Sequence, residues 1–95
     1  MRLSILDPIR VVYQGNAREV VLPGADGELS VLDFHQPFLY SLRSGYIKIT
    51  QQTWQRKNAN IALPKQTNIV IKKGMARMER NELVILVELE TTKKA

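Results

Sequence analysis

The stretch VLPGADGELSVL, residues 21–32, decides the fold class of this chain. Two short apolar runs flank a turn that is rich in glycine, proline and aspartate, which is typical of two strands joined by a tight turn. The turn is not a phosphate-binding loop, because it lacks the lysine and the hydroxyl residue of that motif and leads into a strand pattern instead of a helix. Residues 21–32 therefore predict two strands with a sharp turn between them.

Outward from this stretch, apolar and polar side chains alternate with the period of two that indicates strands with one buried face. Leu3 and Ile5 alternate with polar neighbours, Ile47 and Ile49 do the same, and Phe38, Tyr40 and Leu42 share one face of another run. The segments 20–22 and 83–87 are almost continuously apolar, as expected of central strands in a sandwich. Turn signals recur at intervals of about 8–12 residues; they lie at Asp7-Pro8, Gly15-Asn16, Pro23-Gly24, Asp26-Gly27, Asp33, Ser44-Gly45, Lys57-Asn58, Pro64, Lys73-Gly74 and Arg80-Asn81.

These patterns predict one all-β domain over residues 1–90, a flattened β-sandwich or barrel of about ten short, mostly antiparallel strands. No segment has a convincing helical pattern. Gly15-Asn16 and Arg80-Asn81 are predicted to form two-residue hairpin turns, because Gly and Asn tolerate a positive φ. We expect the polar segment 51–60 to be an exposed hairpin at an edge, and residues 91–95 to be a frayed tail.

The length and composition exclude several classes of protein. A chain of 95 residues is one domain by size, and it contains no cysteine for a disulfide or a thiolate metal site. No run approaches the ~18 apolar residues of a membrane-spanning helix. The first residues, MRLSILDP, lack the apolar core of a secretory signal peptide.

The net charge of +5 is unevenly distributed along the chain. Residues 1–42 hold three basic and five acidic side chains, a net charge of −2, whereas residues 43–95 hold eleven basic and four acidic ones, a net charge of +7. Such a split favours a charged partner, whether a protein, a nucleic acid or a membrane surface.

Residues with catalytic potential are few. His35 is the single histidine, and there is no G-x-S-x-G motif to supply a nucleophile beside it. We therefore interpret His35 as a structural or interface residue and predict no catalytic residue, no metal site and no cofactor. The acidic residues Asp26, Glu28 and Asp33 suit a solvated acidic turn, a cation or general acid–base site, or a patch that docks on a basic surface.

Two other functions remain open from composition alone. The basic residues near positions 56–57 and 72–80, together with Tyr46 and Trp54, suit a small basic β-barrel that binds nucleic acid through phosphate contacts and stacking. However, they are scattered over several predicted strands and define no groove. A stand-alone scaffold that uses the same fold is the other alternative.

The order of motifs along residues 2–89 resembles the N-terminal domain of the epsilon subunits of F-type ATP synthases. Family members have a strand that ends in L-P-G-x-x-G-E-[LF], followed by V-L, H-x-P-L, L and G-x-[IVL]. Their counterparts here are 22–29, 31–32, 35–38, Leu42 and Gly45-Tyr46-Ile47. The first hairpin of the family resembles Leu3-x-Ile5, Asp7-Pro8, Val12-Tyr13-x-Gly15 and Glu19-Val20-Val21, and its last hairpin resembles Gly74-Met75-Ala76 and 81–86.

Several positions depart from the family pattern. Asp33 and Phe34 stand where the family has Pro-Gly before the histidine, Ser30 replaces a glycine, and Lys73 replaces the first residue of a Gly-Gly pair. Family members also continue into an α-helical hairpin that regulates hydrolysis and in some members binds ATP. The sequence stops at Ala95, before any such hairpin, so neither property is carried over.

The resemblance implies a non-catalytic rotor subunit that couples ion-driven rotation to ATP synthesis. Its partners would be the gamma subunit and the ring of membrane-embedded c subunits, with no nucleic acid and with membrane association only through the complex. Its location would be the cytoplasmic face of a bacterial inner membrane. The implied c-ring contacts form a loop at Asp26, Gly27, Glu28, Leu29, Val31, Leu32, Asp33 and Phe34, and the implied gamma contacts are Asp7, His35, Tyr40 and Lys72.

Overall fold

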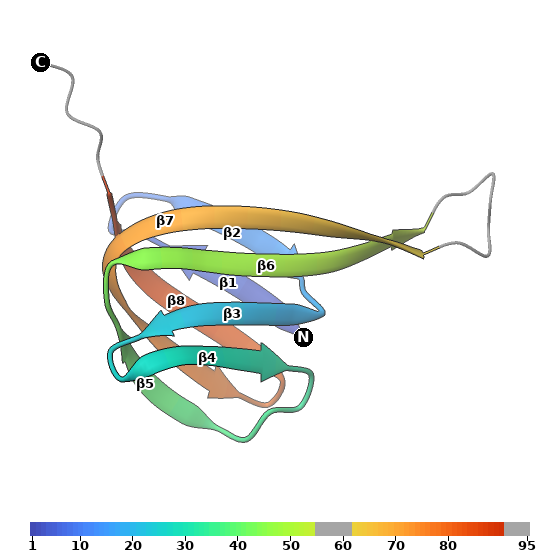
Figure 1. Cartoon of the computed structure of the whole chain (residues 1–95), viewed down its shortest axis with the longest axis horizontal. Helices are drawn as coiled ribbons and strands as arrows, with labels where there is room; N and C mark the ends of the chain where they lie inside the picture. The colour runs from blue at the N-terminus through green and yellow to red at the C-terminus, as the bar shows by residue number, and fades with distance from the viewer. Residues whose placement is uncertain (55–61, 91–95) are drawn as a thin grey trace, which may run out of the picture.

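The computed structural model describes residues 1–54 and 62–90, in which all regular structure is β-strand (Figure 1). The predicted all-β class is therefore confirmed, but the strands number eight in this part of the chain instead of about ten. They are β1 (Arg2–Leu6), β2 (Val11–Asn16), β3 (Glu19–Gly24), β4 (Gly27–Leu32), β5 (Phe38–Leu42), β6 (Gly45–Trp54), β7 (Ala62–Glu79) and β8 (Glu82–Leu89).

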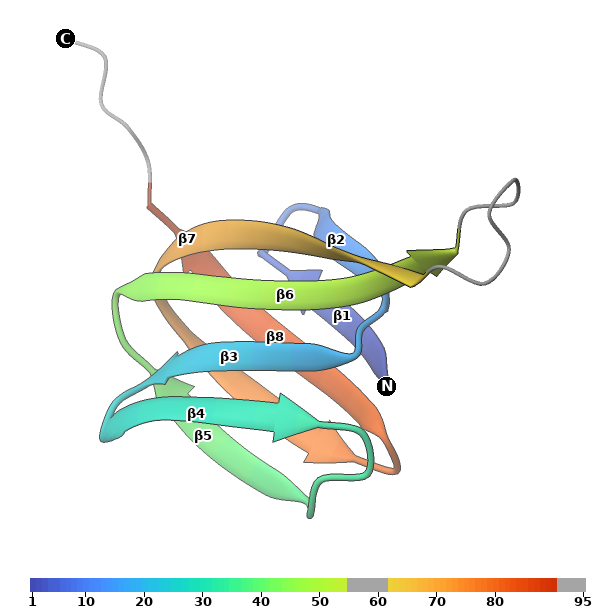
Figure 2. The ribbon, with the colours of Figure 1, turned by 45° about the vertical axis from the view of Figure 1, so that its right-hand side comes forward.

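The strands form two layers that share the long strand β7. The pairing order is β2-β1-β8-β7-β5-β3-β4, and β6 joins β3 to β7. Figures 1 and 2 show β6, β3 and β4 in one layer and β2, β1, β8 and β5 in the other, with β7 bending from the first layer into the second. All pairs are antiparallel except β1 with β8.

The length of β7 explains why fewer strands form than were predicted. Turns were predicted at Pro64 and at Lys73-Gly74, but β7 runs through both as one strand of 18 residues. A register shift between Ile71 and Lys73 marks a bulge, after which β7 exchanges its partner β6 for β5 and continues beside β8. A bulge bends a strand without ending it, and Gly74 lies at this bend.

Of the two predicted two-residue hairpin turns, one is confirmed and one is wrong. Arg80 and Asn81 have φ values of 53° and 57° and close the β7–β8 hairpin. Gly15 and Asn16 instead lie inside β2, which pairs with β1, while β3 pairs in the other layer. The connection after Asn16 is therefore a crossover between layers, a long-range arrangement that local turn chemistry does not specify.

The core lies between the two layers and follows the predicted alternation. Leu3, Ile5, Ile47 and Ile49 are buried, as their period of two predicted. The other large side chains that are almost fully buried come from four strands, β3, β4, β7 and β8: Val20, Leu22, Val31, Ile71, Met78, Leu83 and Ile85. Such a core fixes the two layers relative to each other, because a shift of register by one residue would expose an entire apolar face.

The predicted hairpin at 51–60 is present as the far end of the β6–β7 pair, which extends to Trp54 opposite Ala62. The rest of the predicted hairpin, at 55–60, and the predicted frayed tail, at 91–95, lie outside the described residues.

Candidate partner-docking surfaces

The segment that was predicted as the c-ring loop is an edge strand with a turn at each end. We call Asp26, Gly27, Glu28, Leu29, Val31, Leu32, Asp33 and Phe34 the β4 surface. Among the described strands, β4 pairs only with β3 and so forms one margin of the front layer in Figure 1. The strand predicted from residues 21–32 is therefore confirmed, and the loop implied by the resemblance is wrong, because Glu28 to Leu32 alternate with strand periodicity.

This alternation divides the β4 surface between solvent and core. Glu28, Ser30 and Leu32 are exposed, whereas Leu29 is half-buried and Val31 is fully buried. The Val31 side chain therefore faces the core and is not presented to a partner. The Glu28 carboxylate lies 3.6 Å from Lys48 Nζ, and the Ser30 hydroxyl donates a 2.6 Å hydrogen bond to Glu19. Ser30, where the family has a glycine, thus links β4 to β3.

The turn after β4 is held by contacts with distant parts of the chain. The Asp33 carboxylate accepts a hydrogen bond from the amino group of Met1. The backbone N–H of Phe34 donates to Asn81 Oδ1 at 2.7 Å, and the N–H of His35 donates to the carbonyl of Leu32 at 3.1 Å. The turn is therefore fixed against the N-terminus and the β7–β8 hairpin.

An aromatic cluster follows this turn. The His35 ring meets Phe38 edge to face with the ring centres 5.3 Å apart, and Phe38 stacks on Tyr40 at 5.1 Å. Tyr40 also lines an open pocket of about 370 Å³ that is formed with the β3–β4 turn and Ser41. The predicted gamma contacts His35 and Tyr40 are thus joined through Phe38, a residue that the sequence analysis did not assign to a partner.

A second surface lies on the outer side of the other layer. Val11, Leu6, Leu86 and Met75 occupy successive positions across β2, β1, β8 and β7, because Leu6 pairs with both Val11 and Leu86 and Leu86 pairs with Met75. The row spans roughly 14 Å at the usual spacing of strands. We call it the apolar row. Leu86 is 54% exposed and Met75 40% exposed, so an apolar strip faces solvent.

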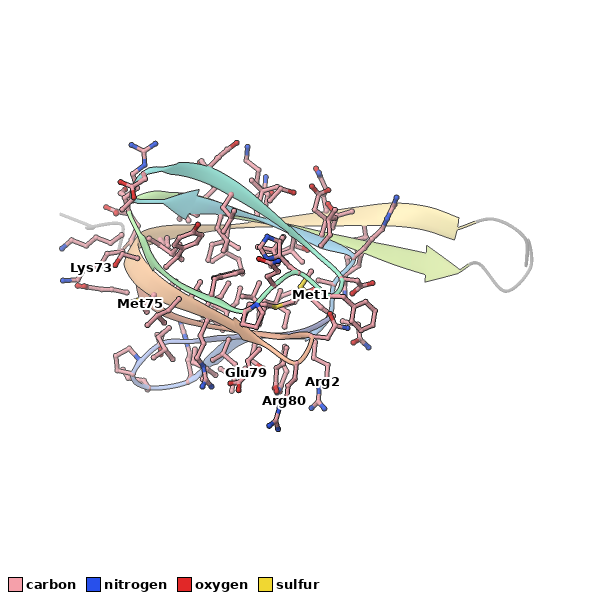
Figure 3. The ribbon with its side chains drawn as sticks, turned by 90° about the horizontal axis from the view of Figure 1, so that it is seen from below. Met1, Arg2, Lys73, Met75, Glu79 and Arg80 are labelled. Atoms are coloured by element: carbon pink, nitrogen blue, oxygen red, sulfur yellow. The ribbon has the colours of Figure 1, made fainter. Side chains whose placement is uncertain are left out.

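A pocket of about 400 Å³ lies beside the apolar row, lined by Leu6, Asp7, Pro8, Lys73, Gly74, Met75, Leu86, Val87 and Glu88. Lys72 and Lys73 place their ammonium groups 3.9 and 3.7 Å from the Glu88 carboxylate. Figure 3 shows Lys73 and Met75 close together along β7, with Glu79, Arg80 and Arg2 at the other end of the same layer. The apolar centre thus has a charged rim, which is the usual anatomy of a protein interface.

Asp7 shapes the turn beside this pocket. Its Oδ1 accepts hydrogen bonds from the backbone N–H groups of Ile9 and Arg10, both at 2.8 Å, and its Oδ2 lies 3.5 Å from Arg10 Nε. These two backbone bonds, with the Arg10 charge as a smaller contribution, lower the pKa of Asp7 from its ordinary value of 3.8. Asp7 is therefore ionised at neutral pH and holds the turn in one conformation.

The four predicted gamma contacts fall into two groups. Asp7 and Lys72 lie beside the apolar row, whereas His35 and Tyr40 lie in the aromatic cluster next to the β4 surface. The apolar row itself was missed, because the run 83–87 was interpreted only as a central strand of a sandwich. In a sandwich of two layers each strand has one face in the core, so a run that is apolar on both faces signals a surface that needs a partner.

In the described ranges 1–54 and 62–90, no three His, Asp or Glu side chains lie in a group that could hold a metal ion. The same residues contain no helix that is long and apolar enough to cross a membrane. What the geometry offers is two exposed surfaces, suited to protein contacts.

The fold places the chain in the class of small two-layer β-sandwich domains. Residues 1–90 match the family model described as "ATP synthase, Delta/Epsilon chain, beta-sandwich domain", and the chain belongs to this family.

Two ATP synthase epsilon chains are similar to this chain over most of its length. It is 35% identical over 88 residues to the chloroplastic ATP synthase epsilon chain of Guillardia theta, covering 92% of this chain and 58% of that protein. The ATP synthase epsilon chain of Campylobacter jejuni is 32% identical, with 93% of this chain and 60% of that protein covered. The chain thus spans less than two thirds of the length of these relatives.

A solved structure supports the fold independently. A chain in the central stalk and c-ring structure of the Tetrahymena thermophila mitochondrial ATP synthase superposes with a TM-score of 0.69 at 17% identity. The match covers 92% of this chain and 62% of that one. At this identity the likeness concerns the fold alone.

Proposed function

We propose that this chain is a non-catalytic subunit of the rotating central stalk of an F-type ATP synthase, which couples ion-driven rotation to ATP synthesis. The match of residues 1–90 to the delta/epsilon family carries the proposal. In this function the chain is peripheral to the membrane and associates with it only through the complex, on the cytoplasmic face of a bacterial inner membrane.

Two partners are proposed, each for one surface. The gamma subunit docks on the apolar row, with Asp7 and Lys72 at its margin, because apolar area that is exposed in the free protein is stabilised by burial against a partner. The aromatic cluster, with His35 and Tyr40, extends this contact toward the β4 surface.

The c-ring docks on the β4 surface through its exposed residues Asp26, Gly27, Glu28, Leu32, Asp33 and Phe34, while Leu29 and Val31 support the strand from within. The segment 19–42 contains four acidic residues and no lysine or arginine. Such a segment attracts the basic groups of a partner and repels acidic ones, which gives the contact its specificity.

Torque transfer requires a rigid path between the two surfaces. The apolar row lies on one layer and the β4 surface on the margin of the other, and β7 belongs to both layers. Backbone hydrogen bonds and a shared core connect the layers, so a load on one surface reaches the other without passing through a flexible linker.

The nucleic-acid alternative receives less support. Lys48, Lys72, Lys73 and Arg77 each lie within 4 Å of a glutamate carboxylate. A phosphate-binding surface requires basic groups that are free to replace counterions.

A matched pair of variants tests the two-surface proposal. Leu86 in the apolar row and Leu32 in the β4 surface are both 54% exposed, so replacing either with lysine should change the free energy of unfolding by less than about 0.5 kcal/mol. We expect Leu86→Lys to weaken binding to the purified gamma subunit at least tenfold with binding to the isolated c-ring unchanged, and Leu32→Lys to do the reverse.

Binding would be measured by biolayer interferometry with partners from the same organism, after thermal melting has shown that both variants fold. Equal effects of the two variants on both partners would contradict the assignment of separate surfaces. Unchanged binding of both variants would contradict the docking proposal itself.

A further inference from the structure

Phe34 carries two unfavourable features, an exposed aromatic ring and a left-handed backbone conformation. Its side chain is 80% exposed, so the ring gains little from burial. Its φ of 62° lies in the left-handed region, which disfavours every residue that has a Cβ and which glycine adopts freely. Residues held in a strained backbone conformation cluster at functional sites, so Phe34 is a candidate contact residue.

The surrounding chain holds this unfavourable conformation in place. Asn81 Oδ1 accepts the hydrogen bond from the Phe34 N–H at 2.7 Å, and Asn81 itself has a φ of 57° in the β7–β8 turn. The Asn81 carbonyl accepts a further bond from Arg2 N–H at 3.1 Å. The turn is therefore ordered before any partner arrives, which removes part of the entropic cost of binding.

The charges nearby indicate the chemistry of the partner. Asp33 precedes Phe34 and keeps its carboxylate half exposed while it contacts the amino group of Met1. An aromatic ring beside the half-exposed Asp33 carboxylate suits a lysine or arginine side chain, which stacks on the ring by a cation–π contact and is attracted by the acid.

We propose that Phe34 is a specificity-determining anchor of the β4 surface, an aromatic side chain that stacks on a basic side chain of the c-ring loops. Asn81 is the positioning residue that orients it. This inference rests on the proposed function, because it takes the c-ring as the partner of the β4 surface.

Substitutions at Phe34 separate the anchor from a purely structural role. Phe34→Gly removes the ring and relieves the left-handed backbone, so we expect binding to the isolated c-ring to weaken on the order of tenfold while the melting temperature stays unchanged or rises. Phe34→Leu keeps an apolar side chain without π electrons and should also weaken binding several-fold, whereas Phe34→Trp should retain it.

Asn81 offers its own matched pair. Asn81→Gly preserves the left-handed turn but removes the acceptor, and Asn81→Asp keeps an acceptor oxygen at the same position. We expect Asn81→Gly to weaken c-ring binding a few-fold and Asn81→Asp to restore it, with gamma binding unchanged in both. If Asn81 had a purely structural role, its substitution would instead lower the melting temperature and weaken binding to both partners together.

The outcomes separate this inference from the proposed function. If the wild-type chain binds the ring and Phe34→Gly binds it with the same affinity, the inference is overturned and the ring contact remains. If Phe34→Gly weakens binding but Phe34→Leu does not, the claim that Phe34 stacks on a basic side chain is overturned. A wild-type chain that binds gamma but not the ring would overturn the ring contact and this inference with it, and a chain that binds neither would overturn the proposed function.

Discussion

Asp7 follows β1 and organises the turn beside the apolar row through its two backbone hydrogen bonds. Because its pKa is lower in the folded chain than its ordinary value of 3.8, folding favours the ionised carboxylate. The resulting stabilisation is fully present above the unfolded pKa and is lost as the pH falls through the folded pKa.

The Asp7→Asn variant tests this linkage. We expect it to melt at a lower temperature than the wild type at pH 6, and we expect the difference to shrink steadily below about pH 4 as the wild-type carboxylate is protonated. The melting temperatures of both chains would be measured by circular dichroism at several pH values between pH 2 and 6. Asp26→Asn, an exposed carboxylate at the tip of the β3–β4 turn, is the control. A difference that is independent of pH would contradict the role of the Asp7 charge.

Burial of single residues was largely predictable where alternation was clear, as for Leu3, Ile5, Ile47 and Ile49. It was not predictable for Leu86, because a continuous apolar run does not say which of its faces meets the core. The exposure of Phe34 also needed the structure, since only the contact with Asn81 shows that the turn holds the ring away from the core. From the sequence alone, the acids at 26–33 fitted a solvated turn, a cation or general acid–base site, or a docking patch.

At the scale of elements, the bulge in β7 depends on a glycine. A Cβ at Gly74 would lie 2.7 Å from the Leu86 carbonyl oxygen, a backbone atom that cannot move without disturbing β8. Gly74→Ala should therefore lower the free energy of unfolding by about 1–3 kcal/mol, with a fall in melting temperature of roughly 4–8 °C per kcal/mol.

The control for this variant is Gly15→Ala, since a Cβ at Gly15 would meet only side-chain atoms, at 3.4 Å or more. Urea denaturation of both variants gives the comparison. A Gly74→Ala chain as stable as the Gly15→Ala chain would mean that the strand exchange does not require this close approach.

Strands were more predictable than their connections. The alternating pattern located most strands, and the turn residues predicted the β7–β8 turn at Arg80-Asn81. The same kind of signal failed at Gly15-Asn16 and Lys73-Gly74, because there the chain bends or changes layer in response to contacts far away in the sequence. Local turn propensity cannot distinguish a bulge from a hairpin turn.

At the scale of the whole molecule, the proposed function treats the chain as one rigid body with two docking surfaces. The family resemblance could be read from the sequence and is confirmed over residues 1–90. The sequence did not show that the predicted contacts divide into a β4 surface, an aromatic cluster and an apolar row, because this division arises from the packing of two layers. The roles proposed for these surfaces depend on membership of the rotor.

The most direct test of that membership is to purify the tagged chain from the membranes of its own host and to identify the accompanying proteins by mass spectrometry. The account predicts recovery of the gamma, beta and c subunits of the ATP synthase together with this chain. Recovery of nucleic acid or unrelated soluble proteins, with no ATP synthase subunit, would contradict it.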